Sequence, residues 1–224
     1  MELGNYKCSG KKYNGEKAII SLTSWKARIN TVSKTLYSLL RNCPGFHIVL
    51  VLSEEEFPKM EKELPENLML FVDGGVIELL WVYKNVKSFK KVLFTMDKYR
   101  EVPIISADDD CIYVCNYAQE LYELFECNNK NLPIAYRRSK IRYCCCGPAT
   151  IYPINIYKQL ISLYKTKIIK NNLQDDNFIS DFLKKEKIHP VYLSNKFPCY
   201  FHDENNPVNG SKKNIMWKND QRFE

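Results

Sequence analysis

Apolar positions in the first half of the chain alternate between strand-like runs and helix-like spacing. Short apolar runs rich in β-branched residues predict buried strands over residues 18–23, 47–52, 76–82 and 103–107. Apolar residues that recur on one helical face predict helices over 32–40 and 89–99, and acidic first-turn residues predict a short helix at 53–58. This alternation indicates an α/β fold with a mostly parallel, Rossmann-like sheet covered by helices on both faces.

The later part of the chain continues the alternation. Helices are predicted over 116–127, from 153 onward and from 175 to 185, and strands over 132–136, 149–152 and 189–193. Residues 18–193 are therefore interpreted as a single domain. Residues 1–17 look like a polar lead-in, and residues 194–224 look like a loop-like tail because Pro, Asn, Gly and charge dominate there.

The run over 102–113 organises the chain, because an apolar strand ends there in three adjacent carboxylates. If the backbone stays extended, Asp108 and Asp110 point to one side and Asp109 to the other. Adjacent carboxylates raise one another's pKa unless a cation neutralises them, and Mg²⁺ or Mn²⁺ suits such oxygen ligands. The alternative is a solvated acidic turn. The buried strand favours a ligand site, because open α/β sheets bind ligands outside the carboxyl ends of their strands.

Charge is distributed unevenly along the 224 residues. The net charge is +7, and basic residues concentrate over 84–100 and 130–142, which indicates an anionic partner such as phosphate, nucleic acid or a lipid surface. No nucleic-acid-binding motif accompanies this charge, so nucleic acid is not expected as a partner. Basic and Tyr-rich segments such as 157–170 suggest the hypothesis of peripheral membrane contact.

The sequence predicts a cytoplasmic protein. Its amino terminus lacks the apolar core of a signal peptide, and its most apolar window, residues 46–52, is too short to span a bilayer. The nine cysteines form no paired C-x-x-C units with zinc spacing, and their odd number fits reduced thiols.

A series of motifs follows in order between residues 18 and 183. They are Ser-Leu-Thr-Ser-Trp at 21–25, Arg-Ile-Asn-Thr at 28–31, Leu-Ser-Glu-Glu-Glu-Phe-Pro at 52–58, Lys-Ser-Phe-Lys-Lys at 87–91, Ala-Asp-Asp-Asp at 107–110 and Asp-Asp-Asn-Phe at 175–178. Together they resemble small bacterial glycosyltransferases of the GT-A (nucleotide-diphospho-sugar transferase) superfamily. The resemblance implies a nucleotide-sugar donor, Mn²⁺ or Mg²⁺, and a saccharide or lipid-linked acceptor in surface polysaccharide synthesis at the inner face of the membrane.

The resemblance also implies nucleotide-binding roles. Thr23, Ser24 and Arg28 would contact the base and ribose, which suits their hydroxyl and guanidinium groups. For Thr23 and Ser24 the alternative is helix-entry chemistry. Lys90 or Lys91 would lie near the nucleotide or its pyrophosphate, and only one of the two is expected to face inward.

The acidic motifs supply the implied metal and catalytic groups. Asp110 would be the main metal contact, Asp108 would serve both metal and nucleotide, and Asp109 would lie beside the nucleotide, with His202 as an extra metal ligand. In inverting members an acidic pair at 175–176 ends in the base that deprotonates the acceptor hydroxyl. Asp176 is therefore predicted as the base and Asp175 as its alternate, although an Asp before a helix is also a common N-cap.

Two other functions remain open from the sequence. A sugar-phosphate nucleotidyltransferase would use a similar sheet, but no Gly-rich phosphate loop follows the first predicted strand. A non-catalytic module that binds polyanions through the basic clusters is the second alternative.

Overall fold

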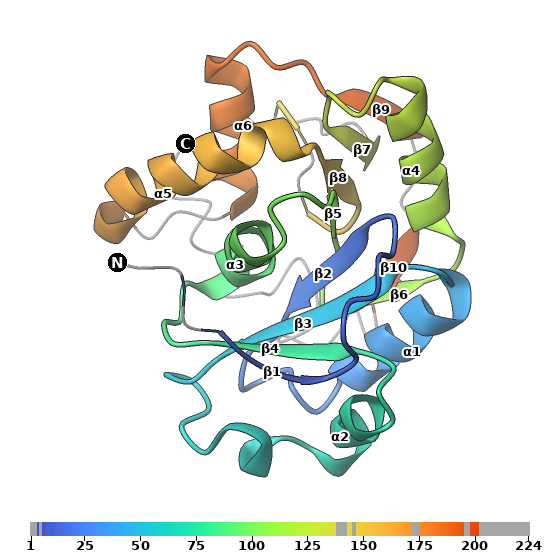
Figure 1. Ribbon diagram of the computed structural model, residues 1–224, viewed down its shortest axis with the longest axis vertical. Coiled ribbons are helices and arrows are strands. Elements are labelled where there is room, and N and C mark those ends of the chain that lie inside the picture. Colours follow the sequence, from blue (N-terminus) through green and yellow to red (C-terminus); the bar gives the residue numbers. More distant parts are fainter. Residues whose placement is uncertain are drawn as a thin grey trace.

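The computed structural model describes Gly4 and residues 6–137, 143–144, 147–171, 175–194 and 198–201, without the side chains of 166–171 and 201. An eight-stranded sheet of order β1-β4-β3-β2-β5-β8-β7-β9 runs through the molecule (Figure 1). Its strands are β1 Lys7–Gly10, β2 Ile19–Thr23, β3 His47–Ser53, β4 Glu78–Val82, β5 Ile104–Ser106, β7 Ile134–Arg137, β8 Thr150–Tyr152 and β9 Val191–Ser194. A separate antiparallel pair joins β6 Cys111–Tyr113 to β10 Cys199–Phe201.

The pairings confirm the predicted mostly parallel sheet. Strands β4, β3, β2 and β5 are parallel neighbours, and β7 and β9 are also parallel. Strand β1 adds antiparallel to β4 at one edge, and β8 pairs antiparallel with both β5 and β7. The carboxyl ends of β2 and β5 therefore meet at one edge of the sheet, where the acidic run follows β5.

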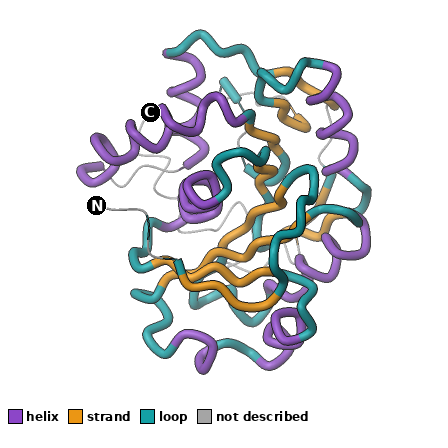
Figure 2. Tube along the Cα trace, viewed as in Figure 1, coloured by secondary structure: helices purple, strands orange, loops and turns teal. Residues whose placement is uncertain are grey.

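Helices cover both faces of the sheet (Figures 1 and 2). Helices α1 Val32–Asn42, α2 Glu66–Asp73 and α4 Tyr117–Cys127 pack on one face, and α3 Lys90–Lys98, α5 Tyr157–Asn171 and α6 Asp175–Lys185 pack on the other. Three single-turn 3₁₀ helices, η1 Met60–Glu63, η2 Lys87–Phe89 and η3 Ile154–Ile156, lie between these elements.

Strand periodicity explains the two cores. Along β3, Ile48, Leu50 and Leu52 join the core under α1, whereas Val49 and Val51 join the core under α3. All five side chains are almost completely buried, and each contributes about 1.5–3 kcal/mol through removal of apolar surface from water. This two-sided burial is why the strands appear in the sequence as continuous apolar runs.

The structure differs from the sequence predictions at several places. Residues 53–58, predicted as a short helix, are mostly turn, and α2 was not predicted because it buries only Leu68 and Val72. The predicted lead-in contains β1, and the predicted tail contains β10. Strand β1 has a mostly exposed, polar sequence because it lies at the sheet edge, so it carries no apolar signal.

Candidate active site

The three adjacent aspartates lie where β5 ends, and Asp109 and Asp110 form a turn rather than an extended strand. The prediction that Asp108 and Asp110 point together, away from Asp109, is therefore wrong. Alternation between two sides requires extended backbone, which the turn into β6 interrupts. Instead, Asp109 and Asp110 both contact Arg28, and Asp108 contacts Lys91.

Arg28 holds the acidic turn from the loop after β2. Its Nη1 lies 2.7 Å from Asp109 Oδ1 and 3.1 Å from Asp110 Oδ2. Ser24 Oγ donates to the other oxygen of Asp109 at 2.6 Å. Burial lowers the pKa of Arg28, but attraction to Asp109 and Asp110 outweighs it and raises that pKa. Arg28 is therefore a permanent cation at the base of the turn.

Two neighbouring residues complete the support of this loop. Thr35 Oγ1, on α1, donates to the carbonyl oxygens of Asp109 and Cys111 at 2.9 and 2.8 Å. Thr23 Oγ1 donates to the carbonyl oxygen of Val51 at 2.7 Å. Of the residues predicted to contact base and ribose, Ser24 and Arg28 thus contact the acidic turn, and Thr23 bonds to the adjacent strand.

Lys91 joins the two acidic motifs. From the first turn of α3, its Nζ lies 2.5 Å from Asp108 Oδ1 and 3.4 Å from Asp175 Oδ2. Burial lowers the pKa of Lys91, but attraction to Asp108, Asp175 and Asp176 outweighs it and raises the pKa well above its usual value. This lysine remains charged, and it brings together carboxylates that lie far apart in the sequence.

Lys90 makes a different set of contacts. Its Nζ lies 2.6 Å from Glu56 Oε2 and donates to Asn85 Oδ1 at 3.2 Å. Lys90 and Lys91 are only 1% and 4% exposed, so the prediction that just one of them turns inward is wrong. Only Lys91 contacts the aspartates, because successive helical residues point about 100° apart.

Gly147 lies between the carboxylates of Asp108 and Asp176. A Cβ at Gly147 would be 3.4 Å from Asp108 Oδ2 and 3.4 Å from Asp176 Oδ2, so both carboxylates face this glycine. Tyr113 fixes the arrangement: its hydroxyl accepts from the Asp108 N–H at 2.9 Å and donates to the carbonyl oxygen of Pro148 at 2.7 Å. The first turn of α6 therefore faces the acidic turn across a backbone segment without a side chain.

Among the described residues, the carboxylates of the site outnumber the cations in ion-pair contact with them. Burial raises the pKa of Asp110 to about 7; Arg28 opposes this shift, and the neighbouring Asp109 and Asp108 add to it. Carboxylate oxygens in such a setting suit a hard divalent cation, which commonly takes one or two protein carboxylates and completes its shell with water and substrate phosphates. The chemistry of Asp108, Asp110 and Asp176 fits that role.

Two observations limit the metal site. Within the described part of the chain, no group of three or more His, Cys, Asp or Glu residues is arranged to hold a metal ion without other ligands. His202, predicted as an extra ligand, lies outside the described residues.

Several site residues escaped sequence reasoning. Glu56, Thr35, Tyr113 and Gly147 contact or support the aspartates or lysines, yet the sequence assigned none of them a role, although Glu56 lies within the motif at 52–58. The Gly-Pro pair at 147–148 was the one available signal, because such pairs mark loops.

No helix among the described residues is long and apolar enough to cross a bilayer.

Comparisons with known proteins identify the fold. No family model matches the chain, and no curated protein matches it. Among solved structures, a cytidylyltransferase from Leptospira borgpetersenii is similar at TM-score 0.54 and 12% identity, over 79% of this chain and 75% of that one. A 2-C-methyl-D-erythritol 4-phosphate cytidylyltransferase from Francisella tularensis is similar at TM-score 0.52 and 10% identity, over 83% and 93%.

The glycosyltransferase GlyE of Streptococcus pneumoniae also matches, at TM-score 0.49 and 16% identity, over 81% of this chain and 46% of that one. The chain thus spans about half the length of this glycosyltransferase. At such identities the likeness concerns the fold alone. Sheet order, helix placement and the two cytidylyltransferase structures together confirm the predicted α/β fold with a Rossmann-like, mostly parallel sheet.

Proposed function

We propose that the protein is a glycosyltransferase that moves a sugar from a nucleotide-diphosphate donor to a saccharide or lipid-linked acceptor. The observation that carries the proposal is the convergence of two acidic motifs on Lys91 and Gly147 at the carboxyl edge of the parallel strands. Ligands of open α/β sheets bind at this edge. The acceptor belongs to bacterial surface polysaccharide synthesis, at the cytoplasmic face of the membrane.

Each charged group has a role in this proposal. Arg28 and Lys91 orient the acidic turn and add positive charge near the donor diphosphate. Asp108 and Asp110 hold Mn²⁺ or Mg²⁺, which supplies Lewis-acid stabilisation of the diphosphate leaving group when it is bound. Ser24, Arg28, Asp108 and Asp109 shape the nucleotide side of the site.

Asp176 is the base in this scheme. Asp175 is less suited to accept a proton, because its Oδ2 lies 3.4 Å from the Lys91 ammonium. As Asp176 takes the proton of the acceptor hydroxyl, the acceptor oxygen forms its bond to the anomeric carbon and the nucleoside diphosphate leaves with the electron pair of the broken bond. Attack from the side opposite the leaving group inverts the anomeric centre.

The second candidate is a nucleotidyltransferase. It is favoured by two solved structures with a TM-score above 0.5, both cytidylyltransferases. The loop after β2, residues 24–31, contains no glycine, which argues against a backbone cradle for a triphosphate there. The two activities differ in product: a nucleoside diphosphate for the transferase and pyrophosphate for the nucleotidyltransferase.

Thermal stabilisation by a panel of nucleoside diphosphates and nucleotide sugars, each with and without Mn²⁺, tests the proposal. A ligand that binds only the native state raises its stability by mass action. We expect one nucleotide to stabilise the protein in a metal-dependent way and to appear as the diphosphate after transfer. No stabilisation by any nucleotide, or release of pyrophosphate from a triphosphate, would contradict the proposal.

Variants of α6 provide a matched pair for the same assay. Asp176→Asn removes the proposed base, whereas Asp181→Asn changes an exposed acid on the same helix. We expect Asp176→Asn to keep the nucleotide-induced stabilisation and to stop transfer, and Asp181→Asn to keep both. If Asp176→Asn instead abolished nucleotide binding, Asp176 would belong to the donor site.

A further inference from the structure

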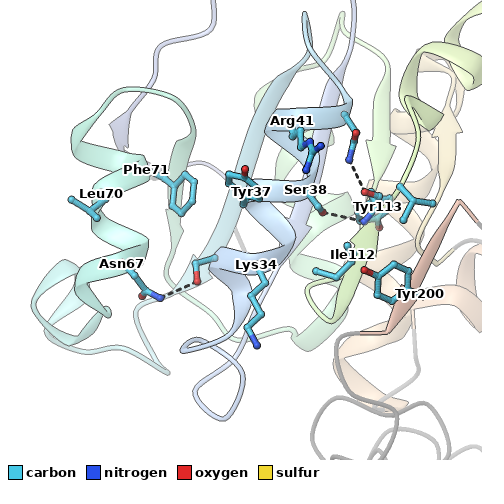
Figure 3. Close-up of a pocket in the computed structure, with 13 residues that line it drawn as sticks. Lys34, Tyr37, Ser38, Arg41, Asn67, Leu70, Phe71, Ile112, Tyr113 and Tyr200 are labelled. Atoms are coloured by element: carbon cyan, nitrogen blue, oxygen red, sulfur yellow. Dashed lines mark hydrogen bonds between the residues drawn. The ribbon is translucent and has the colours of Figure 1, made fainter.

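A groove of about 740 Å³ lies on the outer side of α1, away from the sheet. Figure 3 shows α1 between α2, which carries Asn67, Leu70 and Phe71, and the β6–β10 pair, which carries Ile112, Tyr113 and Tyr200. Its volume falls within the range of small-molecule sites. One lining residue, Tyr113, also supports the acidic site, because its hydroxyl bonds to the backbone of Asp108 and Pro148.

Exposed apolar side chains concentrate around this groove. Tyr37, Leu70, Val114 and Tyr200 line it, and they are 61%, 68%, 57% and 56% exposed. Only three other large hydrophobic residues in the described part of the chain are comparably exposed: Val76, Tyr83 and Ile154. A concentrated, exposed apolar surface of this kind indicates a binding site rather than scattered surface residues.

The charge of the groove has one sign. Lys34 and Arg41 line it from α1, and no Asp or Glu is among its lining residues. Neither cationic side chain has an ion pair or hydrogen-bond partner among the described residues. Two unpaired cations beside aromatic surface favour a ligand that carries negative charge.

The amide groups of the groove are oriented by their own contacts. Asn42 Nδ2 donates to the carbonyl oxygen of Tyr113 at 2.8 Å, and Asn67 Nδ2 donates to Ser33 Oγ at 3.0 Å. These bonds use the donor side of each amide and fix the side chains in the groove wall. The amide oxygens are then acceptors available to ligand hydroxyl groups.

The groove begins beside the acidic turn. Thr35 of α1 bonds to the backbone of Asp109 and Cys111, and a direct neighbour of each lines the groove: Lys34, which precedes Thr35, and Ile112, which follows Cys111. From there the groove follows α1 to Arg41 and Asn42 at the helix's other end. A chain lying in it would have one end near the acidic turn.

We propose that this groove binds an extended, negatively charged saccharide. Tyrosine rings pack against the C–H faces of sugar rings, fixed amide oxygens accept from sugar hydroxyls, and Lys34 and Arg41 pair with carboxylates or phosphates on the chain. A concave groove fits a chain better than it fits a flat bilayer. That this saccharide is the acceptor rests on the proposed function, but binding itself does not.

Calorimetric titration with acidic oligosaccharides tests the inference. The probes are oligogalacturonates and oligosialic acids of increasing length, with neutral maltooligosaccharides as the uncharged comparison. We expect the acidic series to bind, with affinity rising with length, and Tyr37→Ala or Tyr200→Ala to weaken binding about tenfold. Tyr83→Ala, an equally exposed tyrosine outside the groove, should leave affinity unchanged.

Charge is tested separately by a double variant, Lys34→Gln with Arg41→Gln. We expect it to bind acidic and neutral series alike, because both of its changes lie on the exposed side of α1 and only the charge preference is removed. The inference would be overturned if neither acidic series bound, or if Tyr83→Ala weakened binding as much as Tyr37→Ala or Tyr200→Ala. Variant-sensitive binding to phosphatidylglycerol vesicles without oligosaccharide binding would overturn it in favour of a membrane surface.

Nucleotide-induced stabilisation, measured on the same groove variants, separates this inference from the proposed function. We expect Tyr37→Ala and Tyr200→Ala to keep it. Saccharide binding by a protein that responds to no nucleotide would support the groove and overturn the transferase. Stabilisation by a nucleotide without saccharide binding would support the transferase and overturn the saccharide groove.

Discussion

At the amino ends of β3 and β4, the buried carboxylate of Glu78 is surrounded by donors. At the carboxyl ends of β2 and β5, the described aspartates outnumber the described cations that pair with them. Glu78 accepts hydrogen bonds from Lys98 and Tyr99, and its Oε2 lies 2.7 Å from His47 Nε2. These bonds outweigh burial, which alone raises the pKa of Glu78, and lower that pKa to about 2. This amino-end cluster is electrostatically complete.

The carboxyl-end cluster has a different balance. Among the described residues, the four carboxylates of Asp108, Asp109, Asp110 and Asp175 form ion pairs with two cations, Arg28 and Lys91, and Asp176 interacts electrostatically with Lys91. Burial raises the pKa of Asp110 to about 7, and the neighbouring Asp109 and Asp108 add to this shift. Both clusters are buried, so burial of charge does not distinguish them. Among the described residues, the number of cations per carboxylate distinguishes them, and a cluster rich in carboxylates suits a bound cation.

Removal of a central cation should have the largest effect on stability. Lys91→Met leaves Asp108 and Asp175 without their shared partner, and we expect it to reduce the free energy of unfolding by about 3–5 kcal/mol. Lys98→Met is the matched control in the amino-end cluster. The Lys98 side chain is 23% exposed, so water can replace it and the loss should be smaller. Urea unfolding measures the free energy of unfolding of both variants. Equal losses in Lys91→Met and Lys98→Met would contradict the expected difference between the two clusters.

Removal of a carboxylate should have opposite effects at the two ends. Asp110→Asn is expected to reduce transfer about 10²–10³-fold, by analogy with other groups that stabilise developing charge. Its melting temperature should stay the same or rise, because one of several like charges is removed. Glu78→Gln should lose stability and keep transfer. If Asp110→Asn retained full activity, the acidic turn would not be part of the active site.

The sequence predicts part of the carboxyl-end cluster and none of the amino-end cluster. The acidic turn was recognised because Asp108, Asp109 and Asp110 are adjacent and follow an apolar strand. The cluster around Glu78 went unnoticed because His47, Glu78 and Lys98 come from three different elements. Within the carboxyl-end cluster, contacts between elements were likewise missed: Lys91 with Asp175, and Gly147 with Asp176.

The fold was predicted better than the site for a physical reason. Buried strands such as β3 carry a strong signal, because both faces are covered and all positions between its two end residues are apolar. The edge strand β1 and the short helix α2 bury little, so their sequences show no comparable periodicity. Side-chain direction at the turn depends on how the chain reverses after β5, which no local pattern in 107–110 specifies.

Acid should weaken the amino-end cluster over a defined pH range. Because the pKa of Glu78 is lowered from 4.5 to about 2, its contribution to stability is present above pH 4.5 and is lost as pH falls toward 2. The expected loss is about 3 kcal/mol. Glu78→Gln should remove most of this slope in unfolding curves from pH 5 to pH 2. The pKa of Glu16 is also lowered to about 2, so its titration should account for the smaller pH dependence of stability that remains in Glu78→Gln.

The smallest expected effect concerns the two hydroxyls beside the acidic turn, and it distinguishes support from ligand binding. Ser24 Oγ donates to the carboxylate of Asp109, whereas Thr23 Oγ1 donates to a neutral carbonyl. Hydrogen bonds to charged groups are the stronger kind, so Ser24→Ala should cost about 1.5–3 kcal/mol and Thr23→Val about 0.5–1.5 kcal/mol. Nucleotide-induced stabilisation supplies the second readout. If either hydroxyl contacts the nucleotide, its variant loses that stabilisation in addition to the small change in unfolding free energy; a purely supporting hydroxyl changes only the latter.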